Sequence, residues 1–162
     1  MKKLLKAFAG GLLLGIGLMV VVFLTGMRSN SSAVVTRVRH FNRAVGNPRM
    51  MKTAGQPGVT TSVIRHVGRS SGADYETPVG AVATDDGFVI ALPYGRDADW
   101  MKNVLAAGSA TLFKEGQIHM LTQPEIVPTA EVIEFFGPND QRAFKIFGVQ
   151  ECLRLRHALA DV

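Results

Sequence analysis

The segment formed by residues 68–72 has the composition of a phosphate-binding loop. It is Gly68-Arg69-Ser70-Ser71-Gly72, and it follows a stretch with the pattern of a β-strand. Glycines allow a sharp turn that presents backbone N–H groups, Arg69 supplies a charged fork, and the two serine hydroxyls can donate further hydrogen bonds. A Gly- and Ser-rich loop after a strand is also a common hairpin connection, so this loop alone leaves phosphate binding and a structural turn both open.

A second candidate site is the segment 93–100, which joins a predicted strand to a predicted helix. Its sequence is Pro93-Tyr94-Gly95-Arg96-Asp97-Ala98-Asp99-Trp100. A loop that leads into a helix directs free N–H groups outward, and Gly95 permits the close approach of a flat ligand. Tyr94 and the single tryptophan can form the wall of a pocket there, and Trp100 is equally suited to packing in the core.

Other common catalytic patterns are missing from the sequence. It contains no G-x-G-x-x-G, P-loop, H-E-x-x-H or G-x-S-x-G motif and no paired cysteines. The histidines fall on separate predicted elements without the spacing of metal ligands; they are His40, His66, His119 and His157. We therefore expect neither a metal site nor a nucleophilic triad, and the lone Cys152 cannot form a disulfide within the chain.

The composition fits one domain with a modest appendage. The chain has 162 residues, of which 47% are hydrophobic, and this is enough for a real core. Its 18 Lys and Arg exceed its 13 Asp and Glu, for a net charge of +5. This excess favours anionic partners such as phosphorylated cofactors or lipid headgroups. Nucleic acid is not expected, because no predicted strand carries the interleaved aromatic and basic residues that stack bases.

Residues 1–28 have the features of a membrane anchor. The basic start Met1-Lys2-Lys3-Leu4-Leu5-Lys6 precedes residues 7–27, which carry no charged side chain. At a helical rise of about 1.5 Å per residue, about 20 apolar residues cross the roughly 30 Å hydrocarbon core. The sequence therefore predicts one N-terminal transmembrane helix. The alternative is a cleavable signal peptide ending near Ser31-Ser32-Ala33.

Residues 29–58 predict a short linker and an amphipathic helix. Apolar residues recur at spacings of four, three and four; they are Val34, Val38, Phe41 and Val45. The basic side of this helix could face lipid phosphates, or the helix could pack on the following domain. Asn47-Pro48 is expected to end the helix.

Residues 59–162 predict a mainly β domain of the α+β class. Six segments carry clustered β-branched and apolar residues, namely 59–66, 77–84, 88–92, 110–114, 117–122 and 151–157. Turns are predicted at Asp85-Asp86-Gly87 and Glu115-Gly116. One helix is expected from a cap at Asp97 or Asp99 to a stop at Gly108, and another after Pro128 with Thr129 as its cap; these bounds follow from capping preferences. The pattern fits a small barrel of about six antiparallel strands with two or three helices.

The two candidate loops, in this order, resemble the signatures of the deazaflavin-dependent nitroreductases, a family found chiefly in mycobacteria and related actinobacteria. Val67-Gly68-Arg69-Ser70-Ser71-Gly72 followed by Thr77-Pro78-Val79 resembles the family's G-R-x-S-G and T-P-hydrophobic signature. Pro93-Tyr94-Gly95 with Asp99-Trp100 and Asn103-Val104-Leu105-Ala106-Ala107-Gly108 is similar to its second signature. The likeness extends over about residues 41–157. It implies a split β-barrel that binds coenzyme F-420, a deazaflavin hydride donor with a phosphate and an acidic oligoglutamate tail.

The resemblance also implies which residues bind the cofactor, and it assigns no catalytic residue. The phosphate end would be held by Gly68, Arg69, Ser70, Ser71 and Gly72. The ring pocket would be lined by Pro78, Val79, Tyr94 and Gly95, and braced by Trp100 and Asn103. Hydride transfer itself belongs to the cofactor, while the protein orients it.

Two departures from the family keep other ligands open. Asp74 and Glu76 stand where relatives often carry basic residues, so two carboxylates would meet the anionic tail. Tyr75 and Tyr94 are the only tyrosines, whereas the nitroreductases carry tyrosines late in the chain, so an acceptor other than a nitroimidazole is expected. The alternatives are a non-enzymatic carrier of a fatty acid or another apolar ligand, and a relative that binds the flavin mononucleotide, FMN.

The sequence as a whole predicts a membrane-anchored oxidoreductase that uses reduced F-420 to reduce a quinone or another lipid-soluble acceptor. Its expected partners are that small molecule or a lipid, the membrane and, since split barrels of this kind often dimerise across the sheet, a second copy of the chain. A cytosolic reduced cofactor requires a single-pass topology with the domain facing the cytoplasm. Export after signal-peptide cleavage is the alternative.

Overall fold

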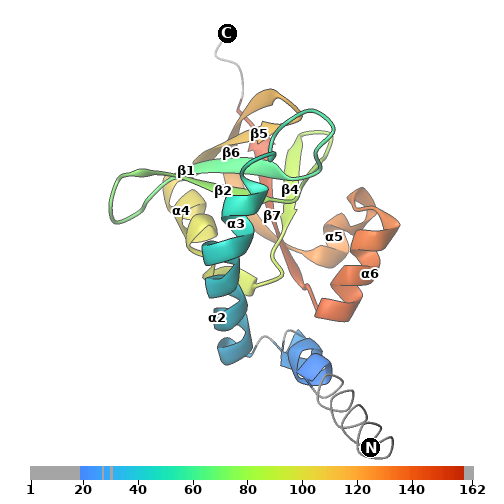
Figure 1. Ribbon diagram of the computed structural model, residues 1–162. Helices are drawn as coiled ribbons and strands as arrows, with labels where there is room; N and C mark the ends of the chain where they lie inside the picture. Colours follow the sequence, from blue (N-terminus) through green and yellow to red (C-terminus); the bar gives the residue numbers. More distant parts are fainter. Residues whose placement is uncertain (1–18, 27, 30, 159–162) are drawn as a thin grey trace, which may run out of the picture.

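Seven antiparallel strands form one curled sheet in the computed structural model, which describes residues 19–26, 28–29 and 31–158 (Figure 1). The strands are β1 (Ser62–Val67), β2 (Asp74–Val79), β3 (Ala81–Ala83), β4 (Gly87–Ala91), β5 (Ser109–Lys114), β6 (Gln117–Pro128) and β7 (Glu151–His157). Their order in the sheet is β2-β1-β5-β6-β7-β4-β3. Because Gly80 alone joins the first and the last strand of this order, the two edges of the sheet meet there and the sheet curls into a half-barrel.

The expected α+β class is confirmed, but the expected number of about six strands was wrong by one. The segment 77–84 is not one strand, because the chain changes partners at Gly80. Residues up to Val79 pair with β1, and residues from Ala81 pair with β4. β6 also extends beyond its predicted end at residue 122, with an irregularity in pairing between Thr122 and Glu125. Both differences depend on pairing with strands far away in the sequence.

The core lies inside the curled sheet and under helix α4 (Asp99–Ala107). Its fully buried side chains include Ile64, Ile90, Leu112, Leu121, Leu153 and Leu155 from the strands and Met101 and Val104 from α4. A second cluster covers the other face of β4 and β7; it contains Val89, Val127, Val132, Phe136 and Cys152. Burial raises the pKa of the Cys152 thiol, so the thiolate is disfavoured and this residue acts as a core side chain.

The helix after the linker does not end at Asn47-Pro48, so that prediction was wrong. α2 (Ser32–Phe41) continues through the π-helical turn η1 (Asn42–Gly46) into α3 (Asn47–Met50). In the π turn the N–H of Asn47 bonds to the carbonyl of Asn42, five residues earlier. Pro48 then occupies the first turn of α3, directly after the wider π turn, which gives its ring room against the preceding turn of the helix.

The other helices were predicted in part. α4 ends at Gly108, whose φ of 69° is the left-handed conformation that glycine favours. It follows the short turn η2 (Gly95–Asp97) and is preceded by Ala98, without a side-chain cap from Asp97 or Asp99. Residue Pro128, not Thr129, precedes α5 (Thr129–Val132), which runs into η3 (Ile133–Phe135). α6 (Pro138–Phe147) was not predicted from the sequence.

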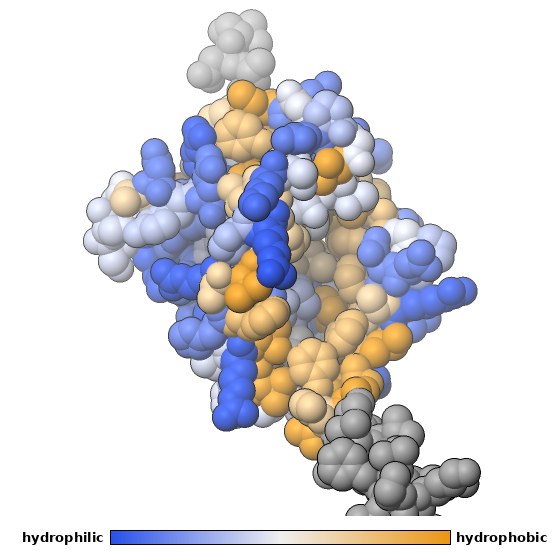
Figure 2. All heavy atoms as spheres, viewed as in Figure 1, coloured by the Kyte–Doolittle hydropathy of each residue, from blue (hydrophilic) through white to orange (hydrophobic). Residues whose placement is uncertain are grey.

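The predicted anchor over residues 1–28 lies for the most part outside the described residues. Residues 19–26 are helical, and no helix within the described part of the chain is long and apolar enough to cross a membrane. Figure 2 shows a band of hydrophilic side chains over α2 and α3, with apolar side chains beside it toward α6. Exposed apolar residues in this part of the molecule include Val20, Val22, Phe23, Phe41 and Ile146.

Candidate functional site

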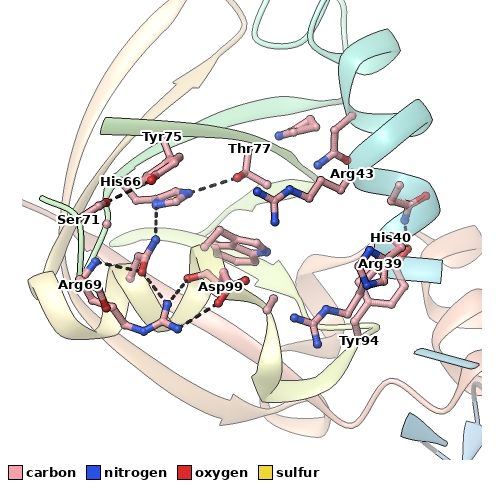
Figure 3. Close-up of a pocket in the computed structure, with 18 of the residues that line it drawn as sticks. Arg39, His40, Arg43, His66, Arg69, Ser71, Tyr75, Thr77, Tyr94 and Asp99 are labelled. Carbon is pink, nitrogen blue, oxygen red and sulfur yellow. Dashed lines mark hydrogen bonds and ion pairs between the residues drawn. The ribbon is translucent and has the colours of Figure 1, made fainter. Parts of the chain in front are cut away.

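A cavity of about 640 Å³ lies between the α2–η1–α3 helix and a second wall built from β1, β2 and the start of α4 (Figure 3). Its volume is typical of sites for small molecules and cofactors. A smaller cavity of about 130 Å³ adjoins it and shares Pro78, Tyr94, Ala98 and Trp100. The two candidate loops, residues 68–72 and 93–100, are well separated in the sequence, but they meet at this cavity.

The structure brings together most of the residues assigned to cofactor binding. The larger cavity is lined by Gly68, Arg69, Ser70, Ser71, Pro78, Tyr94, Trp100 and Asn103. The smaller cavity is lined by Val79 and Gly95, together with residues shared by both. Gly72 lines neither of these two cavities.

Arg69 is engaged with the beginning of α4. Its Nη1 donates to Asn103 Oδ1 at 2.8 Å and its Nη2 to Asp99 Oδ1 at 3.1 Å. The backbone N–H of Arg69 donates to the same Asn103 oxygen at 3.2 Å. Arg69 thus fixes the loop 68–72 to α4, and a phosphate in that loop would have to compete with Asp99 for its guanidinium.

Asn103 also forms a hydrogen bond with His66. Since both donors of Arg69 require the amide oxygen, the amide nitrogen of Asn103 must face His66 Nδ1, 3.1 Å away. His66 Nδ1 therefore accepts, so its hydrogen is on Nε2, which donates to Thr77 Oγ1 at 3.2 Å. The hydroxyl hydrogen of Thr77 is then left for another acceptor, and Thr77 lines the cavity.

Stability should fall as the pH drops below the ordinary pKa of histidine. Burial lowers the pKa of His66 from its ordinary value of 6.5, so below that pH the unfolded chain binds a proton that the folded chain excludes. Burial, with smaller contributions from His157 and Lys114, lowers the pKa of His119 in the same direction. The measurement is urea unfolding at several pH values between 7.5 and 5.5. The midpoint urea concentration should fall as the pH falls.

The matched variants for this measurement are His66→Gln and His40→Gln. His66→Gln should reduce the loss of stability on acidification and leave the part due to His119. His40→Gln, which alters an exposed residue, should follow the wild type. A pH dependence that His66→Gln leaves unchanged would show that His66 is not the buried neutral group described above.

Aromatic side chains provide flat surfaces in the cavity. Tyr75 stacks on His66, with ring centroids 5.9 Å apart and an angle of 18° between the planes. Tyr94 Oη accepts a hydrogen bond of 2.6 Å from Asn42 Nδ2, which joins η1 to the second loop. Trp100 packs partly against the main core and lines both cavities. A planar ligand can therefore lie against the tyrosine and tryptophan rings.

Arg96 fixes the second loop to the sheet. Its guanidinium forms a two-point ion pair with Glu151 at the start of β7, and this hydrogen bonding holds the pKa of Glu151 below its ordinary value. Both side chains are partly solvated, so the pair positions the loop more than it stabilises the fold.

The carboxylates of Asp74 and Glu76 do not line the cavity. β2 alternates its side chains between two faces, and Tyr75 and Thr77 are the ones that face the cavity. Glu76 instead pairs with Arg65 at 2.8 Å on the other face. The expectation that these two carboxylates meet an anionic ligand tail is therefore not supported.

The cavity has an excess of positive charge. Arg39, Arg43 and Arg69 line it, and Asp99 is the one carboxylate among its lining residues. The arginines of the helix were not assigned to the site from the sequence, nor were His66 and Thr77. Arg39, Arg43 and Asn47 recur every four residues, which is the signal that one helix face carries them.

Comparison with known proteins supports the fold. No protein-family model matches the chain, and no curated protein matches it. Among solved structures, the heme storage protein HutZ from Vibrio cholerae is similar over 70% of this chain and 90% of its own, with 11% identity and a TM-score of 0.50. At this identity the similarity concerns the fold alone, and it places the curled sheet among split-barrel-like structures.

Two further structures overlap more loosely. A domain-swapped dimer is 15% identical over 60% of this chain and 80% of its own, with a TM-score of 0.45. An F-420-H2-dependent reductase is 12% identical over 58% of this chain and 92% of its own, with a TM-score of 0.36. Overlaps this loose carry no argument about the activity of this chain.

Proposed function

We propose that this protein is an oxidoreductase that binds a phosphorylated deazaflavin, coenzyme F-420, in the larger cavity and uses its reduced form to reduce a quinone or a similar apolar acceptor. The observation that carries the proposal is the cavity itself, which combines flat aromatic walls with an excess of arginines. A ligand suited to it is planar and carries a negative charge. Both deazaflavins and FMN meet these conditions, and F-420 is favoured by the two sequence signatures.

The residues present fit such a cofactor. Trp100 and Tyr94 offer ring surfaces, Thr77 offers a hydroxyl donor, and no carboxylate other than Asp99 lines the cavity. When bound, the cofactor would supply the hydride. The chain's own contribution is to bind, to orient the ring against the second loop, and to exclude water from one of its faces.

An apolar acceptor and a membrane location complete the proposal. The side chains of Met19, Val20, Val21, Val22 and Phe23 are exposed, with fractions between 41% and 67%, just before α2. Seated in the cytoplasmic leaflet, they would bring the cavity near acceptors dissolved in the bilayer. A homodimer across the sheet would cover Ile118 and Met120, which are 66% and 60% exposed on β6.

The test is an activity assay with reduced F-420 and a water-soluble quinone. The full chain should accelerate oxidation of the cofactor, and Trp100→Ala should slow it about tenfold or more, because about 1.4 kcal/mol of lost ring packing corresponds to that factor. Phe41→Ala is the matched control, since it removes an exposed aromatic ring that does not line the cavity. Circular dichroism checks that both variants are folded. No acceleration by the wild type would contradict the proposed activity.

A non-enzymatic carrier of a fatty acid is the second candidate. It is favoured by the smaller cavity, which adjoins the arginine-lined one and is lined by Val79, Ile90 and Leu92. The carboxylate of a fatty acid would bind the arginines of the larger cavity, and its aliphatic chain would enter the smaller one. Mass spectrometry of an organic extract from the purified protein distinguishes the candidates, because a carrier should release a stoichiometric fatty acid.

A further inference from the structure

One stripe of the α2–η1–α3 helix faces the cavity. Arg39, Arg43 and Asn47 are spaced four residues apart and all line it, and Figure 3 shows the Arg43 side chain extending from the helix toward the middle of the cavity. Like charges four residues apart on a helix repel each other. An anion bound between the two guanidinium groups would relieve that repulsion.

The hydrogen-bonding state of the three cavity arginines differs. Arg69 is bound to Asp99 and Asn103. Arg39 donates from Nη2 to the backbone carbonyl of Asp97 at 2.8 Å. The side chain of Arg43 makes no hydrogen bond or ion pair with any described residue, so its guanidinium donors are available to a ligand.

The opposite wall also presents donors. Thr77 receives the His66 hydrogen bond, so its own hydroxyl hydrogen is left for a ligand. Tyr94 Oη likewise accepts from Asn42, which leaves the phenolic hydrogen to be donated. The one carboxylate that lines the cavity, Asp99, is paired with Arg69. A group rich in acceptor oxygens is therefore the chemical complement of the space in front of Arg43.

We propose that Arg43, assisted by Arg39, is the subsite for the phosphate of the bound cofactor, and that the loop 68–72 positions α4 instead of holding the phosphate. This inference deepens the proposed function and rests on it for the identity of the ligand. Charge-assisted bonds from a guanidinium to phosphate are the strong kind, and Arg43 is the cavity arginine with its donors available.

FMN and riboflavin test the subsite, because they differ only in the phosphate. Titration of the full chain, followed by Trp100 fluorescence, should give at least tenfold tighter binding of FMN than of riboflavin. Arg43→Gln should remove this preference by weakening FMN binding about tenfold or more, while riboflavin changes less than about twofold; tenfold corresponds to about 1.4 kcal/mol. The matched control is Arg37→Gln, on the same helix but outside the cavity lining, and it should bind both as the wild type does.

Retention of the FMN preference in Arg43→Gln, or its loss in Arg69→Gln instead, would overturn the assignment. Weaker binding of Arg43→Gln to phosphatidylglycerol vesicles, with the FMN preference intact, would assign the arginines to a lipid surface and also overturn it. If the wild type binds neither flavin nor F-420, the proposed function fails and the subsite is tested with pyrophosphate. Pyrophosphate should then raise the thermal unfolding midpoint of the wild type and of Arg37→Gln, but not that of Arg43→Gln. Any other result overturns the subsite.

Discussion

Replacing Asn103 with leucine is expected to lower the free energy of unfolding by about 3 kcal/mol, because the buried His66 would be left unpaired and Arg69 would lose two hydrogen bonds that attach the loop 68–72 to α4. Asn103 is 6% exposed and His66 is 5% exposed. The leucine would leave His66 Nδ1 without a donor, and the Arg69 backbone N–H and Nη1 without their acceptor. Urea unfolding at pH 7.5 measures the difference.

Asn139→Leu is the control for this substitution. Asn139 lies in the first turn of α6 and is exposed, so the same chemical change there should alter the free energy of unfolding by less than about 0.5 kcal/mol. Asn103→Asp keeps the acceptor for Arg69, so its free energy of unfolding should lie between those of Asn103→Leu and Asn139→Leu. A loss below about 1 kcal/mol for Asn103→Leu would show that this network does not hold the loop against α4.

Gly87→Ala is expected to destabilise the fold by about 3 kcal/mol, near the upper end for overpacking against backbone. A Cβ at Gly87 would lie 2.0 Å from the carbonyl oxygen of Leu155 and 2.8 Å from the Cα of Arg156. Because these are backbone atoms of β7, the strand would have to move away from β4. The thermal and urea unfolding midpoints should both fall.

Gly80→Ala provides the matched comparison, since nothing lies within 4 Å of the position of its Cβ. We expect an effect within about 1 kcal/mol, because the added methyl group meets no atom and alanine restricts the unfolded chain. Equal destabilisation by the two variants would contradict the close approach of β4 and β7 at Gly87.

Local patterns predicted most strands, but not where one strand ends and another begins. Residues 77–84 are apolar or β-branched except at Gly80, and the change of partner there, from β1 to β4, divides them into two strands. In contrast, α6 carries signals that allow its prediction, because Pro138 is in its first turn and Gly148 follows its end with a φ of 68°. The π turn before Pro48 has no local signature of this kind.

The sequence predicted which loops form the candidate site, but not which residues of the site contact each other. The family resemblance placed Arg69 and Asn103 near one ligand, but 34 positions separate them and nothing local shows that they bind each other. The direction of Asp74 and Glu76 could have been derived, since strand alternation puts them opposite to Tyr75 and Thr77. The arginines of α2 and η1 became part of the site only through the packing of their helix beside β2.

The most direct test of a cofactor site in the larger cavity is a titration of the full chain with oxidised F-420 and separately with FMN. Trp100 is the single tryptophan and lines both cavities, so its fluorescence reports on the site itself. We predict a saturable change with a dissociation constant of about 1 μM or tighter for at least one of them, equivalent to about −8 kcal/mol. The absence of a saturable change with either compound would contradict a cofactor site in the larger cavity.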